Sequence, residues 1–95
     1  MYGRHFNPTV YVLGRELAAI EATEAAYASA SGMSAIASTL LQLCDRDDHI
    51  VASNTIYGGS FAFLKDYLPP KTGITTRFVD IHDLDAVREA ITPRT

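Results

Sequence analysis

The feature of this sequence that most constrains its fold is the alternation of short strand-like runs with helical segments. Three runs have the apolar character expected of buried strands, at residues 24–29, 49–53 and 74–79. Around them, apolar side chains recur at the three- and four-residue spacing of a helix face. Because strands that alternate with helices form parallel sheets covered by helices, the sequence predicts an α/β fold.

Helices are expected at four places in the chain. The first begins at Asn7-Pro8, since proline suits the first helical turn, and its apolar face is formed by Val10, Leu13, Leu17 and Ile20. The next two are expected over residues 33–44 and 60–68, the latter ended by Pro69-Pro70. Asp83 caps a fourth helix through Ile91, with an inner face of Leu84, Val87 and Ile91.

The length of the chain limits how much of a parallel sheet it can form. With 95 residues there is room for one small domain. Three short strands are few for a parallel sheet, whose members normally have both faces buried. We therefore expect an irregular arm over residues 1–8 and an incomplete α/β domain over residues 9–95, with further chain completing the sheet.

Charge and composition exclude several classes of protein. The formal net charge is −3 and the basic residues are scattered, which argues against a nucleic-acid partner. No apolar run is long enough for a membrane-spanning helix, and the first residues do not resemble a signal peptide. The single cysteine, Cys44, lies in an apolar helical stretch and is expected to be a buried thiol in a reducing compartment. Together these features predict a cytoplasmic protein without a membrane partner.

The first candidate binding site is the junction Ser29-Ala-Ser-Gly-Met-Ser34, which leads into a helix. The first turn of a helix leaves backbone N–H groups unpaired, and the helix dipole adds partial positive charge there. Gly32 lets the backbone approach an anion closely, so the junction is suited to a phosphate group. Small residues that simply pack at such a junction are the more common alternative.

Two further candidates contain tyrosine. Tyr57 follows the strand at 49–53, on the edge of a parallel sheet where ligands collect, and its ring could stack on a flat cofactor or its hydroxyl could pass a proton. Tyr2 and Arg4 offer a hydroxyl and a planar guanidinium suited to phosphate, on an arm that could reach a neighbouring subunit. The alternatives are an edge tyrosine in a turn and a solvated terminus.

The spacing of the residues favours neither a metal site nor a Ser-His-Asp catalytic triad. The three histidines, His5, His49 and His82, are too widely spaced to form a metal site. The acidic run at residues 45–48 is more typical of a solvated turn than of a metal loop. No Ser-His-Asp arrangement can be argued from the spacing.

Taken together, these motifs resemble the Cys/Met metabolism family of pyridoxal-phosphate enzymes. The resemblance covers essentially the whole chain and rests on four segments in a fixed order. They are Tyr2-Gly-Arg4-His-Phe-Asn7-Pro8-Thr9, then Ser31-Gly32-Met33-Ser-Ala-Ile, then Asp48-His-Ile-Val-Ala52 followed by Tyr57-Gly58-Gly59, and finally Phe78-Val-Asp80. Each segment is weak evidence separately, but their order makes them jointly specific.

The resemblance implies a role for each candidate residue. In the family, the pair matching Tyr2 and Arg4 binds the cofactor phosphate of the other subunit, whereas backbone N–H groups matching those of Gly32 and Met33 bind it from within the subunit. The tyrosine matching Tyr57 stacks on the pyridine ring and assists proton transfer. The implied cofactor is pyridoxal 5′-phosphate, and the implied fold is the N-terminal part of an aspartate-aminotransferase-like (fold type I) large domain. Family members are typically homo-oligomers, dimers of dimers that share active sites.

The resemblance also implies a substrate class. Arg4-His-Phe-Asn7 and Ser60-Phe-Ala-Phe-Leu64 are most similar to the methionine γ-lyases, which act on a sulfur amino acid and release a thiol. Bacterial enzymes specialised for methionine commonly have cysteine where this chain has Gly59. Cystathionine γ-lyase or γ-synthase activity, or O-acylhomoserine sulfhydrylase activity, therefore stays open.

The lysine that binds the cofactor covalently in the family is expected outside this chain. The only lysines, Lys65 and Lys71, match no family motif and are expected to be surface residues. Without that lysine the chain alone should not turn over, because the covalent link and the proton shuttle are both lost. A non-catalytic truncated remnant is the alternative from a different class, and a generic nucleotide-binding module ranks last, since no G-x-G-x-x-G or P-loop pattern is present.

Overall fold

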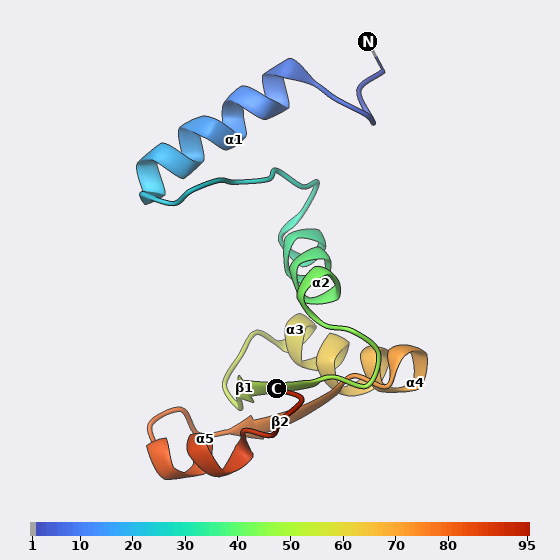
Figure 1. Ribbon diagram of the computed structural model, residues 1–95, viewed down its shortest axis with the longest axis vertical. Helices are drawn as coiled ribbons and strands as arrows, with labels where there is room; N and C mark the ends of the chain where they lie inside the picture. The colour runs from blue at the N-terminus through green and yellow to red at the C-terminus, as the bar shows by residue number, and fades with distance from the viewer. Residues whose placement is uncertain (1) are drawn as a thin grey trace. The chain divides into compact units, whose positions relative to one another are not determined.

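The computed structural model describes residues 2–95 and is a mixed α/β structure with parallel strands (Figure 1). Met1, the first residue of the predicted arm, lies outside the described residues. The chain divides into two compact units, Met1–Ala35 and Ile36–Thr95, here called the N-terminal and C-terminal units. Each unit is described by itself.

Helix α1 (Pro8–Glu21) begins where the sequence predicts. The Asn7 side chain accepts hydrogen bonds from two backbone N–H groups of the first turn, and Pro8 needs no such partner. Ala22 ends the helix in the left-handed conformation, with φ of 56°. Its N–H group bonds back to carbonyls of the last turn, which satisfies groups that would otherwise be unpaired.

The buried side of α1 differs from the prediction. The buried residues are Gly14 and Ala18, and the predicted face is exposed, from Val10, Leu13 and Leu17 to Ile20. The reason is a close backbone approach, because a Cβ atom on Gly14 would lie 2.7 Å from the Ala26 carbonyl oxygen. The extended segment after α1 therefore packs on the small-residue side of the helix.

The predicted strand at residues 24–29 is wrong. That segment is extended but forms no ladder in the described part of the chain, and Tyr27 is 95% exposed. Alanine is a weak strand former, and strand formation requires a neighbouring strand to accept the backbone hydrogen bonds. Helix α2 (Gly32–Leu43) follows it and agrees with the predicted helix at 33–44.

The C-terminal unit is built on two parallel strands, β1 (His49–Ser53) and β2 (Thr75–Val79), and both were predicted. In their register, His49 lies beside Thr75 at one end of the pair and Ser53 lies beside Val79 at the other. In a parallel strand, every second residue forms backbone hydrogen bonds to the same neighbouring strand. The odd-numbered residues of β1 therefore direct their backbone N–H and C=O groups away from β2, toward the other edge of β1. There the His49 N–H donates to the Arg94 carbonyl at 3.1 Å.

A nearly continuous helical segment covers one face of this sheet, and its course corrects the prediction. It consists of α3 (Gly58–Ala62), the π-helical turn η1 (Phe63–Tyr67) and α4 (Leu68–Thr72), so the helix passes through Pro69-Pro70 instead of ending there. Prolines lack the N–H groups that α-helical carbonyls four residues earlier require. The wider π turn, in which the Leu68 N–H bonds to the Phe63 carbonyl, accommodates them.

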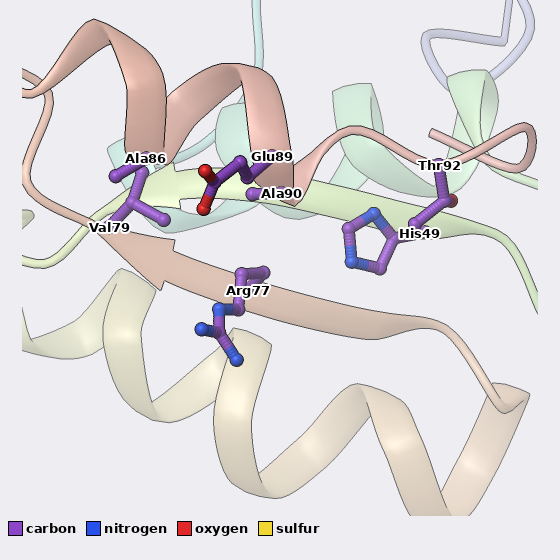
Figure 2. Close-up of a pocket in the computed structure, with 7 residues that line it drawn as sticks. All are labelled: His49, Arg77, Val79, Ala86, Glu89, Ala90 and Thr92. Atoms are coloured by element: carbon purple, nitrogen blue, oxygen red, sulfur yellow. The ribbon is translucent and has the colours of Figure 1, made fainter.

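Helix α5 (Leu84–Ala90) lies on the opposite face of the sheet (Figures 1 and 2). Asp83 caps it as predicted, its Oδ1 accepting from the Ala86 N–H at 3.1 Å. The predicted inner face is wrong in part, because Leu84 is 71% and Ile91 is 58% exposed, whereas Ala90 is buried. A helix of seven residues has only about two turns, so few of its side chains can face the sheet.

The apolar core of the C-terminal unit lies between β1, β2 and the helical segment. Its buried centre is Leu64, Leu68 and Ile74. Partly buried side chains pack around it, namely Leu40, Cys44, Ile50, Ala52, Ile56, Phe63 and Phe78. Phe78 also contacts Phe61, with ring centroids 4.6 Å apart. This core fixes the carboxyl end of β1, from which the loop to α3 departs.

Candidate functional site

The start of α2 offers unpaired backbone N–H groups. Ser31 organises the turn, because its Oγ accepts from the Ser34 N–H at 3.1 Å while its carbonyl accepts from the Ser29 hydroxyl at 3.1 Å. Within residues 2–95, the N–H groups of Gly32 and Met33 have no hydrogen-bond partner. The helix dipole adds partial positive charge at this position, so the turn can accept an anion.

The space in front of this turn is open. A Cβ atom on Gly32 would meet nothing within 4 Å, and Gly32 itself is exposed. Packing within the described chain therefore does not require glycine here. An anion with several oxygen atoms, such as a phosphate group, fits both the free N–H groups and the open approach to them.

Tyr57 precedes α3 and presents its ring to solvent. Its carbonyl accepts from the Phe61 N–H at 2.9 Å, which fixes its backbone at the start of the helix, while its side chain is 72% exposed. In the loop between β1 and Tyr57, the Ser53 Oγ accepts from the Thr55 N–H at 3.2 Å. A Cβ atom on Gly58 would meet nothing within 4 Å. The ring is thus free to stack on a planar group.

Tyr2 and Arg4 lie on a compact turn before α1. The Tyr2 carbonyl accepts from the N–H groups of both His5 and Phe6, at 3.0 and 3.2 Å. The Tyr2 side chain is 67% exposed, and Arg4 is exposed and forms no ion pair with residues 2–95. A guanidinium and a phenol hydroxyl that have no hydrogen-bond or ion-pair partner among the described residues are suited to binding a phosphate group.

The five predicted site residues fall in both units. Tyr2, Arg4, Gly32 and Met33 belong to the N-terminal unit and Tyr57 to the C-terminal unit. Within the N-terminal unit, no hydrogen bond or ring contact of the described residues joins the Tyr2–Arg4 turn to the start of α2. The sequence placed a helix start at Asn7-Pro8, but the capping hydrogen bonds of the Asn7 and Ser31 side chains were not predicted. A small polar residue just before a helix was the available signal for both.

The two lysines are engaged with aromatic rings on the helical segment. Lys65 Nζ lies 5.4 Å from the centroid of the Phe61 ring, and Lys71 Nζ lies 5.3 Å from that of Tyr67. Both pairs are four residues apart on a helix surface, a spacing at which side chains meet. These positions agree with the expectation that the lysines are surface residues.

The acidic turn at residues 45–48 is a structural element. Asp48 Oδ2 accepts from the Asp45 N–H at 2.7 Å, and its Oδ1 forms an ion pair with Arg94 at 2.8 Å. No group of three potential metal ligands occurs among residues 2–95. In the same part of the chain, no helix has both the length and the apolar character needed to cross a bilayer.

A separate open hollow of about 420 Å³ lies between the sheet and α5, and Figure 2 shows the side chains that line it. Its charged lining residues are Arg77 from β2 and Glu89 from α5, and His49 from β1 also lines it. Its rim includes Thr92, near the Thr95 hydroxyl that bonds His49 Nδ1 at 2.8 Å. None of the predicted site residues lines this hollow.

Comparisons with known proteins agree with the resemblance seen in the sequence. The profile of a family described as "Cys/Met metabolism PLP-dependent enzyme" matches residues 1–95. A methionine γ-lyase of Arabidopsis thaliana is 56% identical over 91 residues, covering 96% of this chain and 21% of its own length. An L-methionine γ-lyase of Pseudomonas putida is 44% identical over 94 residues, covering 99% and 23%.

A solved structure shows the same fold. A protein of Campylobacter jejuni described as an O-acetylhomoserine (thiol)-lyase superposes with a TM-score of 0.89 at 38% identity, covering 94% of this chain and 22% of its own. That structure contains N′-pyridoxyl-lysine-5′-monophosphate. The present chain spans about a fifth of the length of these relatives.

Proposed function

Because the chain belongs to the Cys/Met metabolism family of PLP-dependent enzymes, we propose that residues 1–95 form the phosphate-binding and ring-binding part of a lyase that acts on a sulfur amino acid. The observation that carries the proposal is the start of α2, where the N–H groups of Gly32 and Met33 have no hydrogen-bond partner within residues 2–95 and the space beside Gly32 is open. The family's cofactor is pyridoxal phosphate, whose phosphate group fits this turn.

Residues of both units have roles in holding the cofactor. The N–H groups of Gly32 and Met33 bind the phosphate oxygens, and the exposed ring of Tyr57 stacks on the pyridine ring. Tyr2 and Arg4 bind the phosphate of a second copy of the chain. This last role makes the enzyme a homo-oligomer with shared active sites, consistent with the lack of a partner for Arg4 among residues 2–95.

The proposed reaction is γ-elimination, in which a thiol leaves the γ-carbon of the substrate. When bound, pyridoxal phosphate supplies an electron sink that stabilises negative charge at the α-carbon of an amino acid. Tyr57 moves a proton to the leaving sulfur in this proposal, since its hydroxyl has no partner within residues 2–95 and its ring is assigned to stack on the cofactor. Lys65 and Lys71 match no family motif and are exposed, so neither is assigned as the covalent partner, and residues 1–95 alone are not expected to turn over.

The proposed fold of this chain is the N-terminal part of an aspartate-aminotransferase-like large domain. The parallel pairing of β1 and β2, with helices on both faces, supports it. So does the superposition with the Campylobacter jejuni structure at a TM-score of 0.89.

A complete enzyme is needed to test the proposal. It can be made from the Arabidopsis thaliana methionine γ-lyase by replacing its matching segment with residues 1–95, which are 56% identical to that segment. We expect this exchanged enzyme to bind pyridoxal phosphate and to release methanethiol from methionine. Failure to retain the cofactor, while the unexchanged enzyme retains it, would contradict the proposal.

The role of Tyr57 is tested in the same enzyme with Tyr57→Phe. This change removes the hydroxyl but keeps the ring, so we expect thiol release to slow by about 10² or more while the cofactor remains bound. Turnover and cofactor content, measured on the same preparation, separate the two functions of the side chain. Unchanged turnover would exclude proton transfer by Tyr57.

Replacement at the γ-carbon is the second candidate reaction. An O-acetyl-L-homoserine sulfhydrylase of Leptospira meyeri is 42% identical over 95 residues, so identity alone does not separate elimination from replacement. Rates with methionine and with O-acetylhomoserine plus sulfide, compared in the full-length protein that contains these residues, decide between them. A faster reaction with the acylated substrate would favour the sulfhydrylase.

A further inference from the structure

Asn7 joins the turn that carries Tyr2 and Arg4 to helix α1. Its Oδ1 atom accepts from the N–H groups of Thr9 at 3.0 Å and Val10 at 3.2 Å. Its own backbone is extended, with φ −132° and ψ 115°, so the chain changes direction at this residue. The side chain therefore fixes the angle at which the turn leaves the helix.

A ring contact holds the turn against the same end of the helix. The Phe6 and Tyr11 rings have centroids 5.7 Å apart, and the guanidinium of Arg15 lies 6.0 Å from the centroid of the Tyr11 ring. The turn itself is closed by the two hydrogen bonds to the Tyr2 carbonyl. The turn, the cap and the first helical turns thus form one ordered element from which the Arg4 side chain extends without a partner in residues 2–95.

We propose that Asn7 is a positioning residue for the cofactor phosphate, because it holds Tyr2 and Arg4 in a fixed orientation relative to α1. The proposal rests on the proposed function, in which these two residues bind the phosphate of a second copy. Asn7 touches neither cofactor nor substrate in this role. It acts only through the two side chains that it orients.

The physical basis is pre-organisation. An arm that is ordered before binding loses less conformational freedom when it meets the phosphate. If the Asn7 side chain is removed, two helix N–H groups lose their acceptor and the turn is free to sample other directions. The cost of ordering it is then taken from the binding free energy, so affinity falls although every phosphate-contacting group is still present.

The test uses the complete exchanged enzyme and measures the affinity of pyridoxal phosphate by equilibrium dialysis. The loss of an N-cap corresponds to about a fivefold change in an equilibrium constant, so we expect Asn7→Ala to weaken binding by about fivefold. Serine also caps helices, so Asn7→Ser should bind almost as tightly as the unsubstituted enzyme. If Asn7→Ala does not fold, Asn7→Gly takes its place, since glycine caps a helix with little loss of stability but leaves the turn unrestrained.

A matched control is present in the same chain. Asp83 caps α5 with a comparable bond of 3.1 Å to the Ala86 N–H, and it has no role at the proposed site. Asp83→Ala should lower the melting temperature as Asn7→Ala does, yet leave the affinity for pyridoxal phosphate unchanged. An equal loss of affinity in both variants would overturn the positioning role, because it would show a general effect of stability.

A combined substitution tests whether Asn7 acts through Tyr2 and Arg4. In a Tyr2→Ala/Arg4→Ala background, the further change Asn7→Ala should have almost no additional effect on affinity, because both groups being positioned are gone. Fully additive losses would overturn the inference. Failure of the proposed function is distinguishable, since Arg4→Ala itself would then leave the affinity unchanged.

Discussion

The C-terminal unit has an apolar core, whereas the N-terminal unit is ordered mainly by hydrogen bonds at its helix ends and by one close backbone approach. Leu68 and Ile74 are 0% and 2% exposed in the former, while the only buried apolar side chain of the latter is Ala18, at 7%, among the described residues. Apolar burial is the dominant favourable term in folding. The unit that carries Tyr2, Arg4, Gly32 and Met33 is therefore the less stable of the two.

This difference has a functional meaning. Binding elements that must accept a ligand or a second subunit are drawn from the less stable parts of a protein. The exposed apolar stripe of α1, from Val10 to Ile20, and the 95% exposed Tyr27 show that the N-terminal unit has apolar surface still to bury. The strands, by contrast, form a scaffold that already holds the loop leading to Tyr57.

The largest expected effect is that of Leu68→Ala in the 95-residue chain. Truncating a fully buried leucine should lower the free energy of unfolding of the C-terminal unit by about 2–5 kcal/mol. Denaturant unfolding followed by circular dichroism measures it, and Leu43→Ala, at a side chain 75% exposed, is the control with an expected change within about 0.5 kcal/mol. An equal loss from Leu17→Ala in α1 would break the contrast between the units.

A smaller effect is expected from Gly14→Ala in the N-terminal unit. The new methyl group would lie 2.7 Å from the Ala26 carbonyl oxygen, and such overpacking costs about 1–3 kcal/mol, partly offset by about 1 kcal/mol of better helix propensity. We expect faster amide exchange over residues 22–30 and unchanged exchange in β1 and β2. Gly32→Ala, where the space is open, is the matched control. Faster exchange in the strands would show that the units are not independent.

The smallest effect concerns the thiol of Cys44 next to the core. Burial, with the negative charges of Asp48 and Asp45, raises the pKa of this thiol. As the pH rises, the thiol therefore ionises at a lower pH in the unfolded chain than in the folded chain. The contribution of the protonated thiol to stability is complete below the ordinary thiol pKa of about 8.5. It is lost as the pH rises through the pKa of the thiol in the folded chain. Alkylation at pH 8 should be slower than for a free cysteine, and Leu68→Ala should accelerate it. A rate equal to that of the free thiol would show that the core does not shield Cys44.

Local signals account for the parts of the fold that could be predicted. Asn7-Pro8 and Asp83 mark helix starts through hydrogen bonds to residues two or three positions away, so the sequence nearby contains all the information needed. The β-branched residues of the two strands are equally local indicators. The α/β class with parallel strands was correct for this reason.

The incorrect predictions concern features that depend on residues distant in the sequence. The segment at 24–29 has no neighbouring strand within residues 2–95, and the side of α1 that is buried was set by the approach of Ala26 to Gly14. Pro69-Pro70 signalled a helix end, but a π turn relieved the clash. At the site, the residue types indicated phosphate and ring binding. How the proposed site is assembled is a matter of long-range geometry that no local pattern encodes.

The outer edge of β1 has a consequence for how such a chain behaves in a cell. Val51 and Ser53 direct their backbone groups to the side where only His49, among the described residues, has found a partner. A strand edge left open in this way accepts any extended segment that reaches it. At high concentration, the open edges of two copies would therefore pair with each other, and the chain would form insoluble assemblies.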